Sequence, residues 1–83
     1  MIEIDFSIKP VPIIPEYVID GDGNKRLYDD NDKLHSYNDL PSYIGADGTK
    51  IWHKHGKRHR DNAPAGIWLD GRKEYWINGE PIK

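Results

Sequence analysis

The sequence predicts an all-β fold, a meander of short antiparallel hairpins, from three observations. Gly or Pro recurs at short intervals, and no window of about 11 residues shows the apolar i, i+3, i+4, i+7 face of a helix. Asp-Gly pairs at 22–23, 47–48 and 70–71 favour tight turns, because Gly accepts positive φ and Asp bonds its own backbone. His35 and His59 lie 24 residues apart, which indicates that the hairpins form a repeat.

The first 16 residues form a leader in two parts. Apolar and polar residues alternate over residues 2–9, which predicts a half-buried N-terminal strand. Three prolines then interrupt an apolar run. Because proline supplies no N–H to a ladder, we expect residues 9–16 to form an extended edge segment.

Two to three copies of the repeat, each of about 24 residues, are expected to follow the leader within a single domain spanning residues 1–83. They cover 17–45, 46–69 and 70–83, and the first copy is degenerate while the last is truncated. In the first copy, strands are expected at 17–19, 26–29, near Leu34 and at 42–44. Further along the chain, they are expected at 50–54, 58–60, 65–69 and 73–77, each close to the common strand length.

Composition limits the class of protein. With 83 residues and 36% apolar content, the chain supports one domain with a thin core. The absence of Cys excludes disulfides and thiolate chemistry, and it favours a cytoplasmic location. No stretch of about 18 apolar residues exists to span a membrane, and Glu3 and Asp5 do not fit a signal peptide.

The net charge of −2 conceals an uneven distribution. Residues 1–49 carry a balance of −6 and residues 50–83 a balance of +4, and residues 50–60 hold five Lys or Arg, three His and no acid. This asymmetry predicts either a homodimer that pairs opposite halves or a basic patch for an anionic partner.

The basic hairpin predicted at residues 50–60 is a candidate nucleic-acid site, because cations follow phosphates and flat aromatic rings stack on unpaired bases. The residues expected to contact RNA are Lys50, Lys54, Lys57, Arg58, Arg60 and His55. Strict alternation would place His53 and His55 on one face of their strand and Trp52 on the other. We expect the tryptophans to lie in the core, because the chain has few aliphatic residues.

Residues 52–65, with the sequence WHKHGKRHRDNAPA, resemble the repeat W-Y-x-N-G-x-x-H-R-x-D-G-P-A of many phage and large-virus proteins. That repeat is similar to MORN repeats and to the YwqK-type antitoxin proteins of bacteria. The match extends over 46–79, weakens over 17–45, and departs from the motif at His55, Asn62 and Ala63. The resemblance implies a β-hairpin repeat fold with a binding role. Its framework residues here are Trp52, Gly56, His59, Pro64, Trp76 and Gly79, and the His59 imidazole is expected to bond backbone at a hairpin corner.

The favoured function is a small bacteriophage-type binding protein that binds RNA through the basic hairpin. Its resemblance to toxin–antitoxin components implies a counter-defence inhibitor that blocks a host toxin ribonuclease in the host cytoplasm. The alternative is a protein–protein interaction module without nucleic acid.

A metal-dependent enzyme with His53, His55 and His59 as zinc ligands is a third possibility, which the surrounding cations disfavour. Residues 29–32 lack the Gly and Glu of a calcium loop and are expected to form a solvated turn. No nucleophile stands with a base and an orienting group, so the chain is expected to be no enzyme and to use no metal or cofactor.

Overall fold

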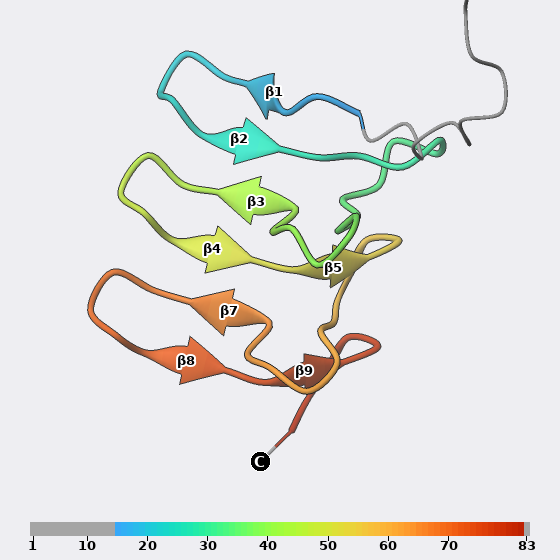
Figure 1. Ribbon diagram of the computed structural model, residues 1–83, viewed down its shortest axis with the longest axis vertical. Helices are drawn as coiled ribbons and strands as arrows, with labels where there is room; N and C mark the ends of the chain where they lie inside the picture. Colours follow the sequence, from blue (N-terminus) through green and yellow to red (C-terminus); the bar gives the residue numbers. More distant parts are fainter. Residues whose placement is uncertain (1–14, 83) are drawn as a thin grey trace, which may run out of the picture.

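A computed structural model describes residues 15–82, and within that range it consists of strands, turns and loops without a helix. The predicted all-β hairpin meander is confirmed (Figure 1). The leader strand at 2–9 and nearly all of the edge segment at 9–16 lie outside the described residues. Over residues 15–82, no helix is long and apolar enough to cross a membrane. The strands of this range are β1 (Val18–Ile19), β2 (Lys25–Arg26), β3 (Tyr43–Ile44), β4 (Lys50–Ile51), β5 (His53–Lys54), β6 (Lys57–Arg58), β7 (Gly66–Ile67), β8 (Lys73–Glu74), β9 (Trp76–Ile77) and β10 (Glu80–Pro81).

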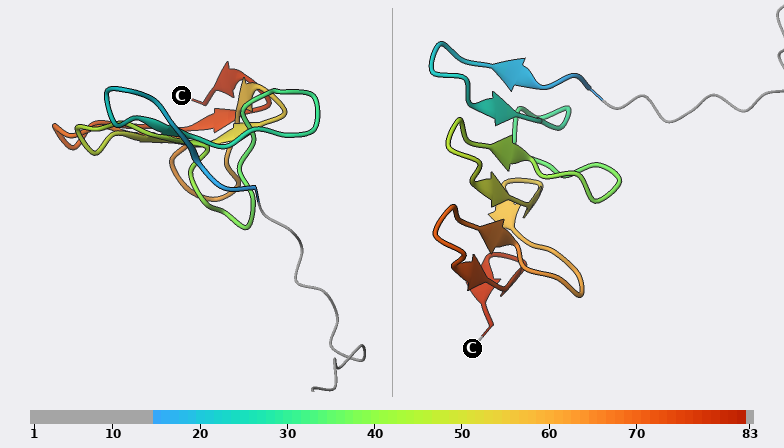
Figure 2. Two further views of the ribbon diagram at one scale, coloured as in Figure 1. Left: turned by 90° about the horizontal axis from the view of Figure 1, so that it is seen from above. Right: turned by 60° about the vertical axis from the view of Figure 1, so that its left-hand side comes forward.

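Two kinds of hairpin recur along the chain, and the sheet hairpins β3–β4 and β7–β8 span the boundaries of the copies given above, because β3 precedes residue 46 and β7 precedes residue 70. Sheet hairpins β1–β2, β3–β4 and β7–β8 join in one antiparallel six-stranded sheet in the order β1-β2-β3-β4-β7-β8. Side hairpins branch from the same end of these strands: the first is closed by the Tyr28–Leu34 bridge, the second is β5–β6 and the third is β9–β10. Successive copies stack along the long axis of the molecule, with the turns of the sheet hairpins aligned on one side (Figures 1 and 2).

The sheet hairpins turn where the Asp-Gly pairs predict. Gly48 adopts a φ of 98°, which an L side chain rarely tolerates, and its N–H donates to the carbonyl of Gly45 at 2.9 Å. The carboxylate of Asp47 accepts the backbone N–H of Thr49 at 2.9 Å, and Asp70 accepts that of Arg72 in the same way. Local chemistry is therefore sufficient to place these turns.

The strands predicted at 50–54 and 73–77 are not continuous, which corrects the sequence interpretation. Trp52 separates β4 from β5, and Tyr75 separates β8 from β9. The N–H of Trp52 donates to the carbonyl of Ala65, just before β7 of the main sheet, whereas its own carbonyl accepts the N–H of His59, just after the side hairpin. The chain thus passes from the sheet to the side hairpin at this residue, so alternation along a single strand does not apply.

The core is small and lies where the two kinds of hairpin meet. Leu27 and Ala65 are fully buried and Trp52 is 5% exposed, so the expected core position of Trp52 is confirmed. Trp68 and Trp76 are only half-buried, so the expectation that the tryptophans lie in the core is wrong for these two. The carbonyls of Leu27, Trp52 and Tyr75 accept equivalent backbone hydrogen bonds, which identifies one position in three copies. Tyr75 is 47% exposed, so this position is buried in the first two copies and half-open in the third.

Backbone hydrogen bonds between copies supplement this thin core. The N–H of Gly56 donates to Leu34 at 2.7 Å, and the N–H of Gly79 donates to Arg58 at 2.8 Å. The second and third side hairpins are therefore each fastened to the returning strand of the side hairpin before them.

Candidate functional site

The basic hairpin predicted from the sequence is the second side hairpin, β5–β6. His55 and Gly56 form its two-residue turn with φ values of 48° and 89°, the signature of a tight hairpin turn. The expectation that His55 shares a strand face with His53 is therefore wrong. Asn78 holds the equivalent turn position in the third side hairpin with a φ of 50°, which explains why the repeat motif has Asn there.

Two lysines lie across the glycines of neighbouring side hairpins. A Cβ at Gly56 would lie 3.5 Å from Cβ and Cδ of Lys33, and one at Gly79 would lie 3.5 Å from Cβ of Lys57. The missing side chains let the aliphatic stems of both lysines pack, while both residues stay exposed. Sequence reasoning missed Lys33, although its spacing of 24 residues from Lys57 could have indicated it.

Arg60, predicted to contact RNA, is engaged by other residues of the protein instead. Its Nε and Nη2 each lie 3.0 Å from a carboxylate oxygen of Asp39, and Nη1 donates to the carbonyl of Pro64 at 3.1 Å. The guanidinium carbon lies 3.8 Å from the centre of the Trp52 ring, and the side chain is 17% exposed. Hydrogen bonding to Arg60 lowers the pKa of Asp39. Arg60 therefore belongs to the framework.

Two other predicted RNA contacts also face acids from other copies. Arg58 Nη1 lies 3.6 Å from Glu74 Oε1, and its guanidinium lies near the rings of Trp68 and Trp76. His55 Nδ1 lies 2.7 Å from Asp29 Oδ2. The basic run contains no acid in sequence, yet its arginines are neutralised across the copies.

Lys50, Lys54 and Lys57 remain exposed, and none of them forms an ion pair with the described part of the chain. Lys50 lies apart from the other two, in strand β4 of the main sheet. Among the residues predicted to contact RNA, the arginines thus form ion pairs within the protein, whereas the lysines form none within residues 15–82.

The expected hydrogen bond from a framework histidine to backbone is present in two copies. His59 Nδ1 accepts the N–H of Asn78 at 3.0 Å, and His35 Nδ1 accepts the N–H of His55 at 3.0 Å. An imidazole nitrogen that accepts carries a lone pair, so the proton of each neutral ring lies on Nε2. In His59 that Nε2 lies 3.1 Å from Asp61 Oδ1.

Asp29, His35 and His55 come closer to metal-site geometry than the three histidines considered from the sequence, with ligand atoms within 4.8 Å of one another. The His55 hydrogen bond, followed by backbone N–H groups, lowers the pKa of Asp29 to about 2. His35, however, uses the lone pair of Nδ1 to accept a hydrogen bond from the backbone N–H of His55. A metal ligand ordinarily donates its other ring nitrogen instead. The three residues therefore fit the framework of the repeat better than a metal ion.

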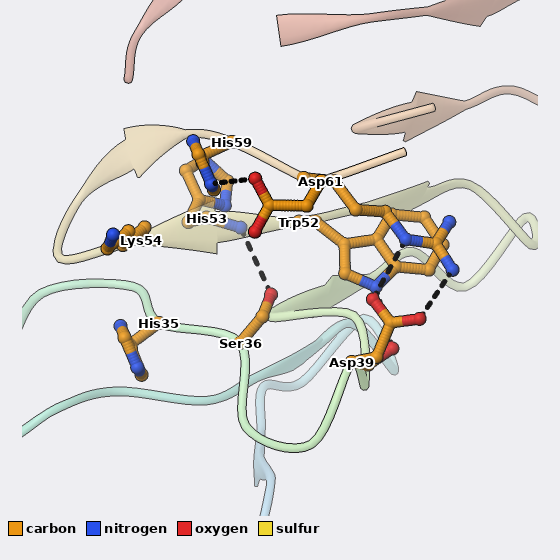
Figure 3. Close-up of a pocket in the computed structure, with 9 residues that line it drawn as sticks. His35, Ser36, Asp39, Trp52, His53, Lys54, His59 and Asp61 are labelled. Carbon is orange, nitrogen blue, oxygen red and sulfur yellow. Dashed lines mark hydrogen bonds and ion pairs between the residues drawn. The ribbon is translucent and has the colours of Figure 1, made fainter. Parts of the chain in front are cut away.

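A cleft of about 420 Å³ lies between the second side hairpin and the loops that follow the first and second side hairpins (Figure 3). It is lined by His35, Ser36, Asp39, Trp52, His53, Lys54, His59, Arg60 and Asp61. Burial, followed by the charge of Arg58, lowers the pKa of His53 to about 4, so this imidazole is neutral at pH 7. Its Nδ1 lies 2.6 Å from Ser42 Oγ, but Ser42 is fully buried and offers no accessible nucleophile.

The charges of the cleft largely cancel, because its two carboxylates, Asp39 and Asp61, are matched by its two cations, Arg60 and Lys54, and Arg60 pairs directly with Asp39. Lys54 is the lining cation that faces no acid within residues 15–82. The cleft therefore has neither a catalytic arrangement nor a strong field for an anion. The exposed lysines Lys33, Lys54 and Lys57 lie on the side hairpins near this cleft and form no ion pair within residues 15–82.

Comparison of the chain with models of protein families, with curated proteins and with solved structures finds no match. The resemblance to MORN-like repeats therefore remains a prediction.

Proposed function

We propose that this protein is a repeat-built RNA-binding protein whose side hairpins present lysines to the phosphates. The observation that carries the proposal is the repeated placement of Lys33 and Lys57, whose stems pack on Gly56 and Gly79. Packing of the stem reduces the freedom that a surface lysine loses on binding, while the ammonium group stays in solvent. Lys54 adds a third cation on the second side hairpin.

The proposed biological role is that of a small phage-type counter-defence inhibitor. The resemblance to antitoxin-like repeats supports a host toxin ribonuclease as target, because a protein that occupies RNA competes with such an enzyme for its substrate. A non-enzymatic role is consistent with the buried Ser42 and the cancelled charges of the cleft. The place of action would be the host cytoplasm.

The experiment is a filter-binding titration with random single-stranded RNA at 50 and 200 mM salt. Replacing Lys33→Glu and Lys57→Glu together should weaken binding at least tenfold and flatten the slope of log affinity against log salt by about 1.4, since each single-strand phosphate contributes about 0.7. Lys33→Arg with Lys57→Arg keeps the charge and should retain binding. Unchanged affinity in the Glu variant, with an unchanged circular dichroism spectrum, would refute the proposal.

A protein–protein interaction module is the second candidate, and one observation favours it. Val18 and Ile19 are 58% and 61% exposed on β1, an edge strand of the described sheet. Exposed edge strands recruit strands of other chains. Tight capture of a partner protein together with no RNA binding at low salt would favour this candidate.

The expected homodimer remains a proposal, but the argument for it changes from the opposite charges of the two halves to the exposed edge of the sheet. Asp39 forms an ion pair with Arg60 and Asp29 hydrogen-bonds His55 within one chain, so part of the complementarity between the two halves is used internally. The exposed edge at β1 is the remaining reason to expect association. Light scattering after gel filtration at micromolar concentration should give twice the 9.6 kDa chain mass, and a monomer mass would remove the claim.

A further inference from the structure

One face of the six-stranded sheet carries an alternating row of isoleucine and lysine. Residues that stand directly opposite each other in neighbouring strands point to the same face. The register therefore gives the isoleucine–lysine row Ile19, Lys25, Ile44, Lys50, Ile67 and Lys73, one residue per strand. Strands lie about 4.8 Å apart, so a lysine recurs about every 10 Å along the row.

Charged residues on the two faces of the sheet differ in whether they form ion pairs. On the opposite face, Arg26 lies 2.8 Å from Asp20, and Glu74 lies 3.6 Å from Arg58. The three lysines of the isoleucine–lysine row are exposed, and residues 15–82 provide no acid within ion-pair distance of any of them. Opposite charges on neighbouring strands would stabilise the sheet, and this row has none. Its positive charge is therefore available to a partner.

The isoleucines between the lysines add exposed apolar surface to the positive charge of the row. Ile44 and Ile67 are half-buried, so each keeps part of its apolar surface open between two ammonium groups. A partner that matches the row carries regularly spaced anions joined to apolar surfaces. Single-stranded RNA has both, because its phosphates alternate with unpaired bases that contact apolar side chains.

The isoleucines of the row favour a single strand over a duplex. The bases of a duplex are paired and stacked inside the helix, whereas the unpaired bases of a single strand can lie against apolar side chains such as Ile44 and Ile67. A single strand therefore matches the whole row, whereas a duplex gains little from binding there. An acidic protein surface would meet the charges but would leave the isoleucines uncovered.

We propose that the isoleucine–lysine row is a track for single-stranded RNA that makes one phosphate contact per copy, through Lys25, Lys50 and Lys73. This inference rests on the proposed function and places a second contact line on the sheet, apart from the side hairpins. The repeat thus multiplies a weak contact along one ligand, as other repeat proteins build extended binding surfaces.

The test compares two double variants with the same change in net charge. Lys50→Glu with Lys73→Glu alters the row, and Lys54→Glu with Lys57→Glu alters the second side hairpin. Both are titrated with single-stranded and duplex RNA of equal length. The row variant should bind the single strand at least tenfold more weakly than the unmodified protein, with a salt slope reduced by about 1.4. The duplex should lose less than threefold.

Other outcomes separate the inference from the function on which it rests. Loss of binding in the hairpin variant with full binding in the row variant would overturn the track and leave RNA binding intact. No RNA binding by the unmodified protein would overturn both. Equal affinity for poly-aspartate of matched charge would identify an acidic protein surface as the occupant and overturn the track. Lys50→Arg with Lys73→Arg keeps the positive charge and should retain binding. This control shows whether replacing the two side chains is tolerated when the charge of the row is unchanged.

Discussion

The Nδ1 atom of His59 lies 3.0 Å from the backbone nitrogen of Asn78 and fastens the third side hairpin to the residues after the second. His35 makes the same bond to His55 one copy earlier. A side-chain acceptor thus satisfies a turn N–H that has no partner within its own two-residue hairpin. These histidines serve the connection between copies.

Replacing His59→Ala should lower the free energy of unfolding by about 1–2 kcal/mol, because the N–H of Asn78 loses its acceptor. Urea denaturation measures this change, and hydrogen exchange should show faster exchange at Asn78. Lys54→Ala, an exposed change on the neighbouring hairpin, should stay within about 0.5 kcal/mol. Equal stability of the two variants would contradict a framework role for His59.

Two glycines of the sheet hairpins should respond oppositely to alanine. A Cβ at Gly66 would lie 2.6 Å from two ring atoms of Trp68, so the indole must move. We expect Gly66→Ala to cost about 1–3 kcal/mol and to alter tryptophan fluorescence. At Gly21 no atom lies within 4 Å, and Gly21→Ala should be neutral or slightly stabilising. Equal melting temperatures would show that Trp68 does not pack on β7.

Trp52 and Tyr75 occupy one repeat position but should differ in importance. Trp52 is 5% exposed and donates its indole N–H to the carbonyl of Asp39 at 2.9 Å. Trp52→Phe should therefore cost about 2–3 kcal/mol through lost volume and a lost hydrogen bond. Tyr75→Phe, at a position that is 47% exposed, should cost less than about 0.5 kcal/mol. Chemical denaturation of the two variants decides whether burial sets this order.

Arg60→Gln separates a framework arginine from a phosphate contact. The change removes a two-pronged ion pair with Asp39 and the stacking of the guanidinium on Trp52. We expect a loss of about 1–2 kcal/mol in unfolding free energy. The salt slope of RNA binding should stay unchanged. If the slope of log affinity against log salt fell by about 0.7, Arg60 would instead contact a phosphate of the RNA.

Stability should fall in two stages as the pH is lowered. The pKa of His53 is lowered by burial to about 4, below the ordinary value of about 6.5, so the unfolded chain binds the proton first. Stability is complete above about pH 6.5 and declines as the pH falls toward 4. Melting temperatures measured from pH 7.5 to 4.5 should show this decline, and His53→Gln should reduce it.

The second stage comes from carboxylates. Asp29, whose pKa is lowered to about 2 chiefly by His55, contributes stability above its unfolded pKa of about 3.9. That contribution is lost as the pH falls from about 4 toward 2. Asp29→Asn should flatten this stage, while Asp30→Asn, in the same turn, should retain the fall of the unmodified protein. A fall equally steep in both variants would contradict the role of Asp29.

The repeat motif predicted the framework better than the binding surface. Trp52 lies in the core and His59 bonds backbone, as the pattern indicated. Arg60 was predicted to meet RNA, but it belongs with Trp52 and Asp39. His55 was assigned to a strand by alternation, whereas its positive φ places it in a turn. A pattern of residue types reports which positions recur, and it does not report what each side chain faces.

By itself, the sequence determined the absence of helix in residues 15–82, the turns at Asp-Gly and the period of the copies, because these depend on residues close together in the chain. Tertiary structure alone decided which basic side chains have a partner within the chain, since the acid that faces Arg60 lies 21 residues away and the acid that faces His55 lies 26 residues away. It also decided that Lys25, Lys50 and Lys73 form one row, because that row depends on the register of six strands. Local chemistry sets where the chain turns, and the stacking of copies sets which charges meet.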